Sequence, residues 1–334
     1  MITRSKAPLR LGLAGGGSDE NVSAVSATAE SLTKVNGGGQ KHAFLMQVHR
    51  EPELFGRIVR RIAAPTHYIL VNVDAKNSNF DEFKKAVEGI PNVIFTKRMN
   101  VMHGGYSQVA CTLEQIKELY TMIPDFTYIH TISGQDYPCV TTEEFDNFFE
   151  GNSRSYMMLD TVEEQAGWCM GKYSKRIEKW HFHDVFNKPW MVKLKLAGIF
   201  RRLVSWVPRP YKKGMRSIWG GWNWFSLHKS VVDYFLHYTE ENPDYLKRFH
   251  FTTCCDELVY STVLYPHRDE LNIEIRDSKR YIDWHHPRRK KGSPLLLNEN
   301  EYNEVADSGA FFCRKVSMPE SSKLLDMIDD KCRR

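Results

Sequence analysis

The 334-residue sequence lacks several features that would assign it to a specialised class of protein. No apolar run approaches the ~18 residues that a membrane-spanning helix needs, and no continuous apolar stretch follows the basic N-terminus, as it does in a secretory signal. Lys and Arg number 46 against 41 acidic residues, and this small excess does not by itself indicate nucleic-acid binding. We therefore expect a cytoplasmic globular protein with no nucleic-acid partner.

Cysteine pairs with metal-binding spacing are also absent. The seven cysteines are odd in number and form no C-x-x-C pair, which excludes the usual cysteine spacing of zinc sites. The adjacent Cys254 and Cys255 fit disulfide geometry poorly. These observations predict a reduced intracellular protein with neither a bound metal nor another cofactor.

The N-terminal 40 residues differ in composition from the rest. Small and polar residues dominate positions 21–36, and three glycines at 37–39 close the segment. This composition predicts that residues 1–40 form a disordered, linker-like extension and that residues 41–330 form one domain.

From residue 41 onward, strand-like and helix-like patterns of apolar residues alternate along the sequence. Short runs rich in β-branched and aromatic residues predict strands at 42–48, 66–73, 92–95, 126–132, 155–159, 220–227 and 280–284. Helical spacing predicts helices at 51–62, 80–87, 107–122, 141–149, 229–238, 256–265, 299–305 and 321–328. The alternation predicts an α/β fold with a doubly wound, mostly parallel sheet and flanking helices. Ligands bind such sheets at the carboxyl ends of strands, where Asp74 and residues 133–136 stand.

Residues 4–19 resemble the first segment of GHMP-family sugar kinases, because a basic stretch is followed by Gly15-Gly16-Gly17-Ser18-Asp19. The phosphate loop of that family, a second Gly- and Ser-rich motif, is missing downstream. A kinase needs this loop to hold ATP. A sugar kinase fragment is therefore a minor alternative.

Seven short motifs occur in a fixed order through the remainder of the chain. They are His49, Val71–Asp74 with Lys76, Gly104–Ser107, Ser133–Pro138, Cys255–Glu257, Arg280–Trp284 and Phe311–Lys315. The series resembles the core-2/I-branching glycosyltransferases, the family of β-1,6-N-acetylglucosaminyltransferases and peptide O-xylosyltransferases, over residues 41–328. The resemblance implies a GT-A-like fold and an inverting transfer of GlcNAc or xylose from a UDP-sugar to a hydroxyl group of a glycan.

Such a transfer needs a base for the acceptor hydroxyl and positive charge for the leaving diphosphate. The resemblance assigns the base to Glu257, whose alternative is an ordinary first-turn acid stabilised by the helix dipole. Many GT-A enzymes hold a metal on an Asp-x-Asp motif, but the strand end here carries only Asp74. The resemblance implies a metal-independent enzyme that uses Lys315 and Arg280, with Arg314 as a substitute for Arg280.

The remaining site residues are also implied by the resemblance. We expect Asp74 to contact the uridine or ribose and His49 to line the nucleotide pocket. Tyr106, Ser107, Gln135 and Asp136 would complete the donor site, although Asp136 could simply form a turn. Trp284 could stack on an acceptor sugar or belong to the core. A non-catalytic nucleotide-sugar-binding protein remains the main alternative function.

Residues 188–216 combine nine basic residues, no acidic ones and interleaved apolar residues. This pattern suits an amphipathic segment lying on an anionic membrane face, or a core-packed helix with a solvated basic face. We expect a bacterial enzyme of surface-polysaccharide synthesis that acts on a glycan or lipid-linked glycan, with peripheral contact to the inner face of the plasma membrane.

Overall fold

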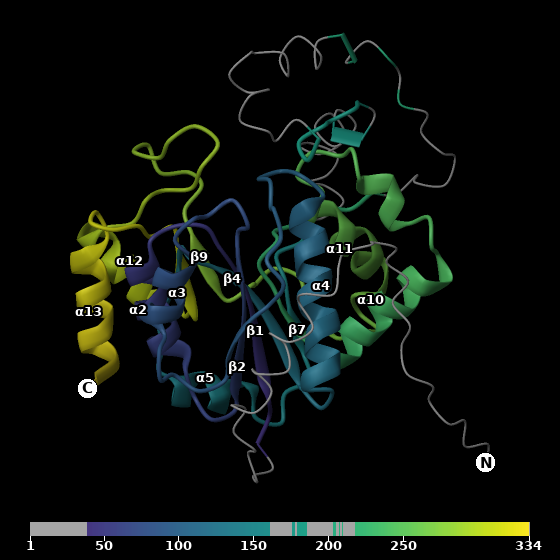
Figure 1. The fold of residues 1–334 in the computed structure, drawn as a ribbon. Coiled ribbons are helices and arrows are strands. Elements are labelled where there is room, and N and C mark those ends of the chain that lie inside the picture. Colours follow the sequence, from purple (N-terminus) through teal and green to yellow (C-terminus); the bar gives the residue numbers. More distant parts are fainter. Residues whose placement is uncertain are drawn as a thin grey trace, which may run out of the picture.

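The computed structural model describes residues 39–160, 176–177, 179–185, 203–204, 207, 209 and 218–333 (Figure 1). The strands are β1 (His42–Val48), β2 (His67–Val73), β3 (Val93–Phe95), β4 (Tyr128–Ser133), β5 (Asp136–Pro138), β6 (Ser155–Tyr156), β7 (Ser226–His228), β8 (Ile273–Glu274), β9 (Arg280–Ile282) and β10 (Phe312–Arg314). The helices are α2 (Pro52–Ile62), α3 (Phe80–Ala86), α4 (Ser107–Met122), α5 (Thr142–Phe149), α10 (Lys229–Glu241), α11 (Asp256–Leu264), α12 (Tyr302–Asp307) and α13 (Ser322–Arg333). Short 3-10 helices cover Leu246–Phe249, Tyr265–His267 and Glu299–Glu301.

A seven-stranded sheet forms the centre of the molecule, in the order β3-β2-β1-β4-β7-β6-β8. The first four strands in this order are mutually parallel, and β7 pairs antiparallel with β4. Every residue of β2 is buried, which is expected of a strand covered by helices on both faces. The predicted α/β fold with a mostly parallel, GT-A-like sheet is confirmed.

Helices cover both faces of this sheet, and each face has its own core. Ala43 and Leu45 point to the side packed by α4, α10 and α11. Phe44 and Met46 point to the side packed by α2, α3, α5 and α13. Because successive side chains of a strand point to opposite faces, the unbroken apolar run of β1 supplies both cores. Figure 1 shows these two helical layers on either side of the strands.

A second sheet of three strands, in the order β5-β10-β9, joins the C-terminal part of the chain to the centre. β10 pairs antiparallel with β5, so that Arg314 lies opposite Asp136, and it pairs parallel with β9. This pairing brings residues 312–316 to the turn that follows β4.

Helix α5 starts at a capping box that the sequence predicts. The Thr141 hydroxyl accepts a hydrogen bond from the Glu144 amide at 3.1 Å, and the Glu144 carboxylate accepts one from the Thr141 amide at 2.7 Å. Both bonds satisfy amide groups that the first helical turn would otherwise leave free. They fix the start of the helix that carries Asp146.

Some predicted elements are shorter than expected. The strand predicted at 220–227 begins only at Ser226, where β7 starts, and it ends at His228. Before Ser226, the Thr131 hydroxyl donates to the Asn223 carbonyl and accepts from the Phe225 amide. These side-chain bonds replace regular ladder bonds before Ser226. The helix predicted at 299–305 is divided into a 3-10 turn and α12.

Two predictions fall largely outside the described residues. The structure describes only 39 and 40 of the extension at 1–40, and only 203–204, 207 and 209 of the basic segment at 188–216. Disorder of the former and membrane contact of the latter stay predictions. Within the described ranges, no helix combines the length and apolar character needed to cross a membrane.

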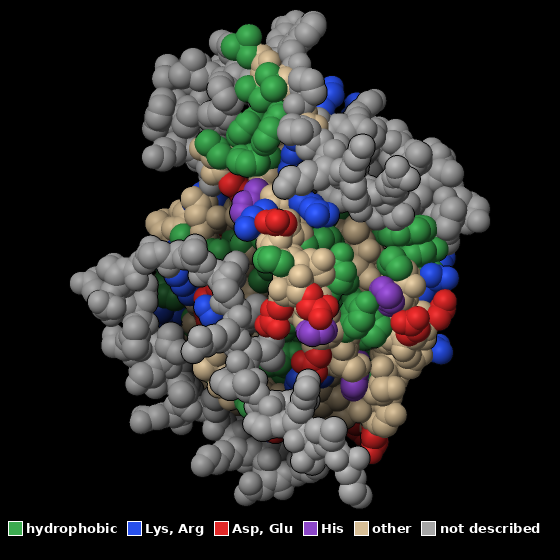
Figure 2. All heavy atoms as spheres, turned by 90° about the vertical axis from the view of Figure 1, so that its right-hand side faces the viewer, with side chains coloured by type: hydrophobic (Ala, Val, Ile, Leu, Met, Phe, Trp, Pro, Cys, Tyr) green, Lys and Arg blue, Asp and Glu red, His purple; other side chains and the backbone are tan. Residues whose placement is uncertain are grey.

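Figure 2 views the molecule from the right-hand side of Figure 1, the side on which α10 lies. Basic, acidic and histidine side chains are interspersed on the coloured part of this face. His237 and Glu241 are exposed side chains of α10, with 3.2 Å between the ring nitrogen and the carboxylate. Exposed contacts of this kind contribute little to stability and are typical of a solvated surface.

Candidate functional site

The carboxyl ends of β1, β2 and β4 place three predicted site segments at one edge of the sheet. His49 follows β1, Asp74 follows β2, and Ser133 ends β4. The Asp74 amide donates to the Val48 carbonyl at 2.9 Å, which holds the first two strand ends together. Parallel pairing therefore assembles residues that lie far apart in the sequence.

The Asp74 carboxylate already has a cationic partner. It accepts a hydrogen bond from the backbone amide of Lys76 at 2.9 Å. It also forms an ion pair with the Lys76 ammonium group at 2.8 Å. The same ammonium donates to the Val101 carbonyl and to Asn100. Asn72 stands two residues before Asp74, where an Asp-x-Asp motif would have its first carboxylate. Its side-chain amide donates to the Lys97 carbonyl. This strand end is thus supplied with an ammonium rather than with paired carboxylates.

Positive charges gather around His49. Partial burial lowers the pKa of His49, and the neighbouring cations Arg50, Lys315 and Lys76 lower it further, while Asp74 opposes them. Burial also lowers the pKa of Lys315, with further contributions from Arg314, Arg50 and Lys290. Like charges that depress one another's pKa are relieved by an anion placed among them. We call Arg50, Lys76, Arg314 and Lys315 the cationic cluster.

The turn Ser133–Asp136 supports this cluster. The Asp136 carboxylate is fully buried and accepts bonds from the Ser133 amide at 2.6 Å and from Arg314 at 3.2 Å. Gln135 donates from its side chain to the Val316 carbonyl, and its own carbonyl accepts from the Val316 amide. Gln135 and Asp136 therefore hold the segment that carries Lys315, and Asp136 has the turn role that the sequence left open.

The position of Arg280 argues against its predicted role at the diphosphate. Its guanidinium donates to the carbonyls of Ser278, Thr131 and Phe225, at 2.6, 3.3 and 3.4 Å, and is only 7% exposed. Burial lowers the pKa of Arg280 to about 10. A guanidinium held among main-chain carbonyls inside the protein stabilises the junction of the two sheets and does not face an external anion. We correct the assignment and use Arg314, the substitute, in its place.

Arg314 lies in the same region and is partly buried, with 14% of its side chain exposed. Its Nη1 donates to the Ser133 hydroxyl at 2.7 Å, and its guanidinium carbon stands 4.2 Å from the centre of the Trp224 ring. Stacking on an aromatic face is a usual way of orienting a guanidinium. No pattern in the sequence connects Arg314 with Trp224.

A second cluster forms where the N-termini of α4 and α11 meet. The Cys254 amide donates to the Gly104 carbonyl at 2.9 Å, which joins the two turns. Ser107 donates from its hydroxyl to Asp184 at 2.5 Å. The ring of Tyr106 lies 4.2 Å from that of His250. Tyr106 and Ser107 thus lie close to the turn that leads into Glu257.

Glu257 is in the first turn of α11 and is about one third exposed. Its Oε2 accepts a bond from Arg176 Nη1 at 2.6 Å. The carboxylate therefore reaches the surface beside a cation that the sequence analysis missed. The two residues are 81 positions apart, and no pattern in the sequence connects them.

Asp256, next to Glu257, has a buried carboxyl group. Its Oδ1 has no hydrogen-bond partner within the described residues. Burial raises the pKa of Asp256 to about 7, and the neighbouring Glu257 contributes to the shift. Two adjacent carboxyl groups thus differ in environment, one buried and one at the surface.

Trp284 follows β9 and is partly buried, and its indole nitrogen is buried without a described partner. The Leu295 amide donates to the Asp283 carbonyl, and the Lys315 amide donates to the Leu295 carbonyl. The loop after β9 therefore lies beside the segment of Lys315. No contact between Trp284 and Glu257 is seen within the described residues, so its acceptor role stays a prediction.

The sequence profile of core-2/I-branching enzymes matches residues 42–306 of this chain. A mouse N-acetyllactosaminide β-1,6-N-acetylglucosaminyltransferase is 33% identical over 114 residues, or 33% of this chain and 28% of the relative. The Arabidopsis thaliana β-glucuronosyltransferase GlcAT14B is 23% identical over 292 residues, or 84% of this chain and 63% of the relative. A human β-1,3-galactosyl-O-glycosyl-glycoprotein β-1,6-N-acetylglucosaminyltransferase is 31% identical over 107 residues, or 30% of this chain and 24% of the relative. The chain thus spans less than two thirds of the length of each.

The burial of Asp256 generates a prediction about stability. In the unfolded chain an aspartate ionises near pH ~3.9, whereas folding raises the pKa of Asp256 to about 7. The folded state therefore binds more protons between these values, and this group makes the protein less stable as the pH rises from ~4 to 7. Asp256→Asn removes the penalty. We expect the variant to melt at a higher temperature than wild type at pH 8, with a difference that shrinks toward pH 4.5. A constant difference at all pH values would contradict the assignment.

Proposed function

This chain belongs to the core-2/I-branching enzyme family, and we propose that it transfers a sugar from a UDP-sugar to a hydroxyl group of a glycan, with inversion at the anomeric carbon. The observation that carries the proposal is the cationic cluster at the carboxyl edge of the sheet. A nucleoside diphosphate would add charge-assisted bonds to these cations beyond those that Asp74 and Asp136 already accept from Lys76 and Arg314. This edge is also where ligands bind doubly wound sheets.

Lys315 and Arg314 are the residues that we propose for the leaving diphosphate. Arg314 offers a planar fork of donors that is oriented by Trp224 and Ser133. Lys315 offers a compact charge, and its segment is held by the reciprocal bonds of Gln135 with Val316. Fixed cations at this place would stabilise the charge that develops as the glycosidic bond breaks.

Metal-independent transfer is part of the proposal. The donor set at the end of β2 supports it, because Asp74 is paired with Lys76 and Asn72 replaces a second carboxylate. Hard divalent ions such as Mg²⁺ are usually bound by one or two carboxylates in addition to substrate phosphates. We propose instead that Asp74 and His49 contact the nucleoside, with Tyr106 and Ser107 farther along the same edge.

Glu257 is the proposed base that accepts the proton of the acceptor hydroxyl. Its position in the first turn of α11, at the surface and beside Arg176, supports the assignment. The base must reach the hydroxyl at about 2.6–3.2 Å in the substrate complex. Arg176 would then orient the carboxylate.

The donor sugar is the part of the substrate that a panel of UDP-sugars tests. The sequence resemblance favours GlcNAc or xylose, and the names of the relatives include N-acetylglucosaminyl and glucuronosyl transferases. A panel of the three UDP-sugars with glycan acceptors, read out by released UDP, tests this choice. We expect turnover with one donor to exceed that with the others at least tenfold.

The Arg176–Glu257 ion pair also favours a second candidate, a protein that binds nucleotide sugars without turning them over. The ion pair at 2.6 Å engages Oε2 of Glu257 and leaves only Oε1 to accept a proton. Under this alternative UDP-sugars bind, but no product forms with any acceptor.

The first functional prediction concerns Glu257→Gln, which keeps the shape of the side chain and removes its basicity. We expect kcat to fall about 10²–10⁴-fold while the affinity for UDP stays within a few-fold of wild type. Glu240→Gln, at an exposed glutamate on α10, is the matched control and should retain full activity. A Glu257→Gln enzyme as active as the control would remove this residue from the mechanism.

The second functional prediction concerns Lys315→Ala. Loss of a charge-assisted bond of about 1.5–3 kcal/mol should lower kcat/KM at least tenfold and weaken UDP binding by a similar factor. Lys323→Ala, at a lysine that is 78% exposed, serves as the control. Equal kinetics for the two variants would show that Lys315 does not contact the donor.

A further inference from the structure

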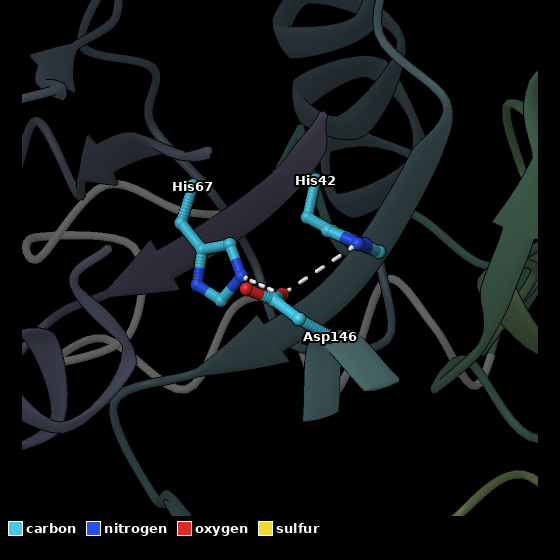
Figure 3. A group of neighbouring side chains, drawn as sticks. All are labelled: His42, His67 and Asp146. Carbon is cyan, nitrogen blue, oxygen red and sulfur yellow. Dashed lines mark hydrogen bonds and ion pairs between the residues drawn. The ribbon is translucent and has the colours of Figure 1, made fainter. Parts of the chain in front are cut away.

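Three ionisable side chains converge at the opposite end of the sheet from the cationic cluster. His42 and His67 are the first residues of β1 and β2, and Asp146 lies on α5. Figure 3 shows both imidazole rings directed at the Asp146 carboxylate. Since Asp74 follows β2 and a strand rises about 3.3 Å per residue, roughly 20 Å separate this group from the donor edge.

His67 is held by acceptors on both sides. Its Nδ1 lies 2.6 Å from the Ile62 carbonyl, and its Nε2 lies 2.7 Å from Asp146 Oδ1. A carbonyl oxygen only accepts, so Nδ1 carries a hydrogen and a neutral ring then presents a lone pair at Nε2. At 2.7 Å the two atoms share a proton in a hydrogen bond. A metal ion bound to both atoms would replace this proton and hold them about 3.3 Å apart, as bonds of about 2.0–2.1 Å at a tetrahedral angle require.

His42 can present a second lone pair to the same place. Its Nε2 lies 3.8 Å from Asp146 Oδ1, and its Nδ1 lies 3.0 Å from His130 Nε2. When Nδ1 donates to His130, His130 can donate in turn to the Ser226 hydroxyl, which is 2.9 Å away. A neutral ring with an orienting bond behind it is the form in which histidine binds metals.

The surroundings of the three side chains are mixed. His42 and His67 are each 1% exposed. The ring of Phe145 packs against both of them, and the ring of Phe44 packs against His67. The side chain of Asp146 is 38% exposed, so the group is reachable from solvent. One ligand atom from each of the three residues lies within 4.8 Å of the others. Apolar walls around few polar atoms strengthen electrostatic attraction at such a site.

We propose that His42 Nε2, His67 Nε2 and the Asp146 carboxylate bind a divalent transition-metal ion, with Zn²⁺ the best fit. Two imidazoles and one carboxylate are ligands that Zn²⁺ accepts, with a water in the fourth position. The Ile62 carbonyl behind His67 and the His130 imidazole behind His42 would hold the two rings in the orientation that binds the ion. The ion would tie β1, β2 and α5 together and stabilise the fold without taking part in glycosyl transfer.

The test uses the full chain without a histidine tag, and it measures Zn²⁺ affinity by competition with a chromophoric chelator. We expect one Zn²⁺ per wild-type chain and at least tenfold weaker binding by Asp146→Asn, in which an amide replaces the anionic ligand. Glu143→Gln, at an exposed acid on the same helix, should bind as wild type does. Equal affinity of the two variants would show that zinc binds elsewhere. Absence of binding to wild type would show that a proton occupies the His67–Asp146 contact.

Two measurements keep the test independent of how well Asp146→Asn folds. Co²⁺ added to wild type should produce the intense visible absorption of a four-coordinate site, and a weak six-coordinate spectrum would contradict the proposal. Zn²⁺ should raise the thermal midpoint of wild type and of Glu143→Gln, and a chelator should reverse the increase. An unchanged midpoint would overturn the proposed stabilisation. The initial rate of glycosyl transfer is a separate readout, so failure here leaves the proposed function untouched.

Discussion

The pairing of β1 between β2 and β4 is the constraint on which the rest of the structure depends. β1 aligns in parallel register with both neighbours, from His42 opposite His67 and Tyr128 onward. Because all three strands run the same way, their last residues meet at one edge and their first residues at the other. The carboxyl edge, with the cationic cluster, and the group of His42, His67 and Asp146 therefore lie at opposite ends of these strands. A slip of one residue would exchange the two cores and separate both groups.

A second pairing, between β5 and β10, adds cations from the end of the chain. Arg314 lies opposite Asp136 although 178 positions separate them. Glu51 strengthens the junction, because its carboxylate accepts from the Ser317 hydroxyl at 2.6 Å and from the Met318 amide at 2.9 Å. The turns after β1, β4 and β10 are thus bonded to one another. Charges of like sign can be held close together here because the main chain around them is fixed.

The sequence predicted the central fold well, since β1, β2 and α4 have long and regular apolar patterns. The same regularity placed Asp74 and Ser133 at strand ends. β5 and β10 escaped prediction because three residues are too few to display a period. Whether a basic side chain is buried or faces a ligand depends on neighbours from distant segments of the sequence. Arg280 therefore proved to be buried among carbonyls, whereas Arg314 on the neighbouring strand β10 is stacked on Trp224.

The central claim is that cations of the protein itself, rather than a metal ion, hold a diphosphate at the carboxyl edge of the sheet. Calorimetric titration of wild type with UDP and with uridine, both in the presence of a chelator, tests this most directly. The account predicts that UDP binds at least a hundredfold more tightly than uridine, because several charge-assisted bonds reach the phosphates. It also predicts that this advantage decreases as salt is added. Equal affinities for UDP and uridine, or a UDP advantage that appears only after manganese is added, would contradict the account.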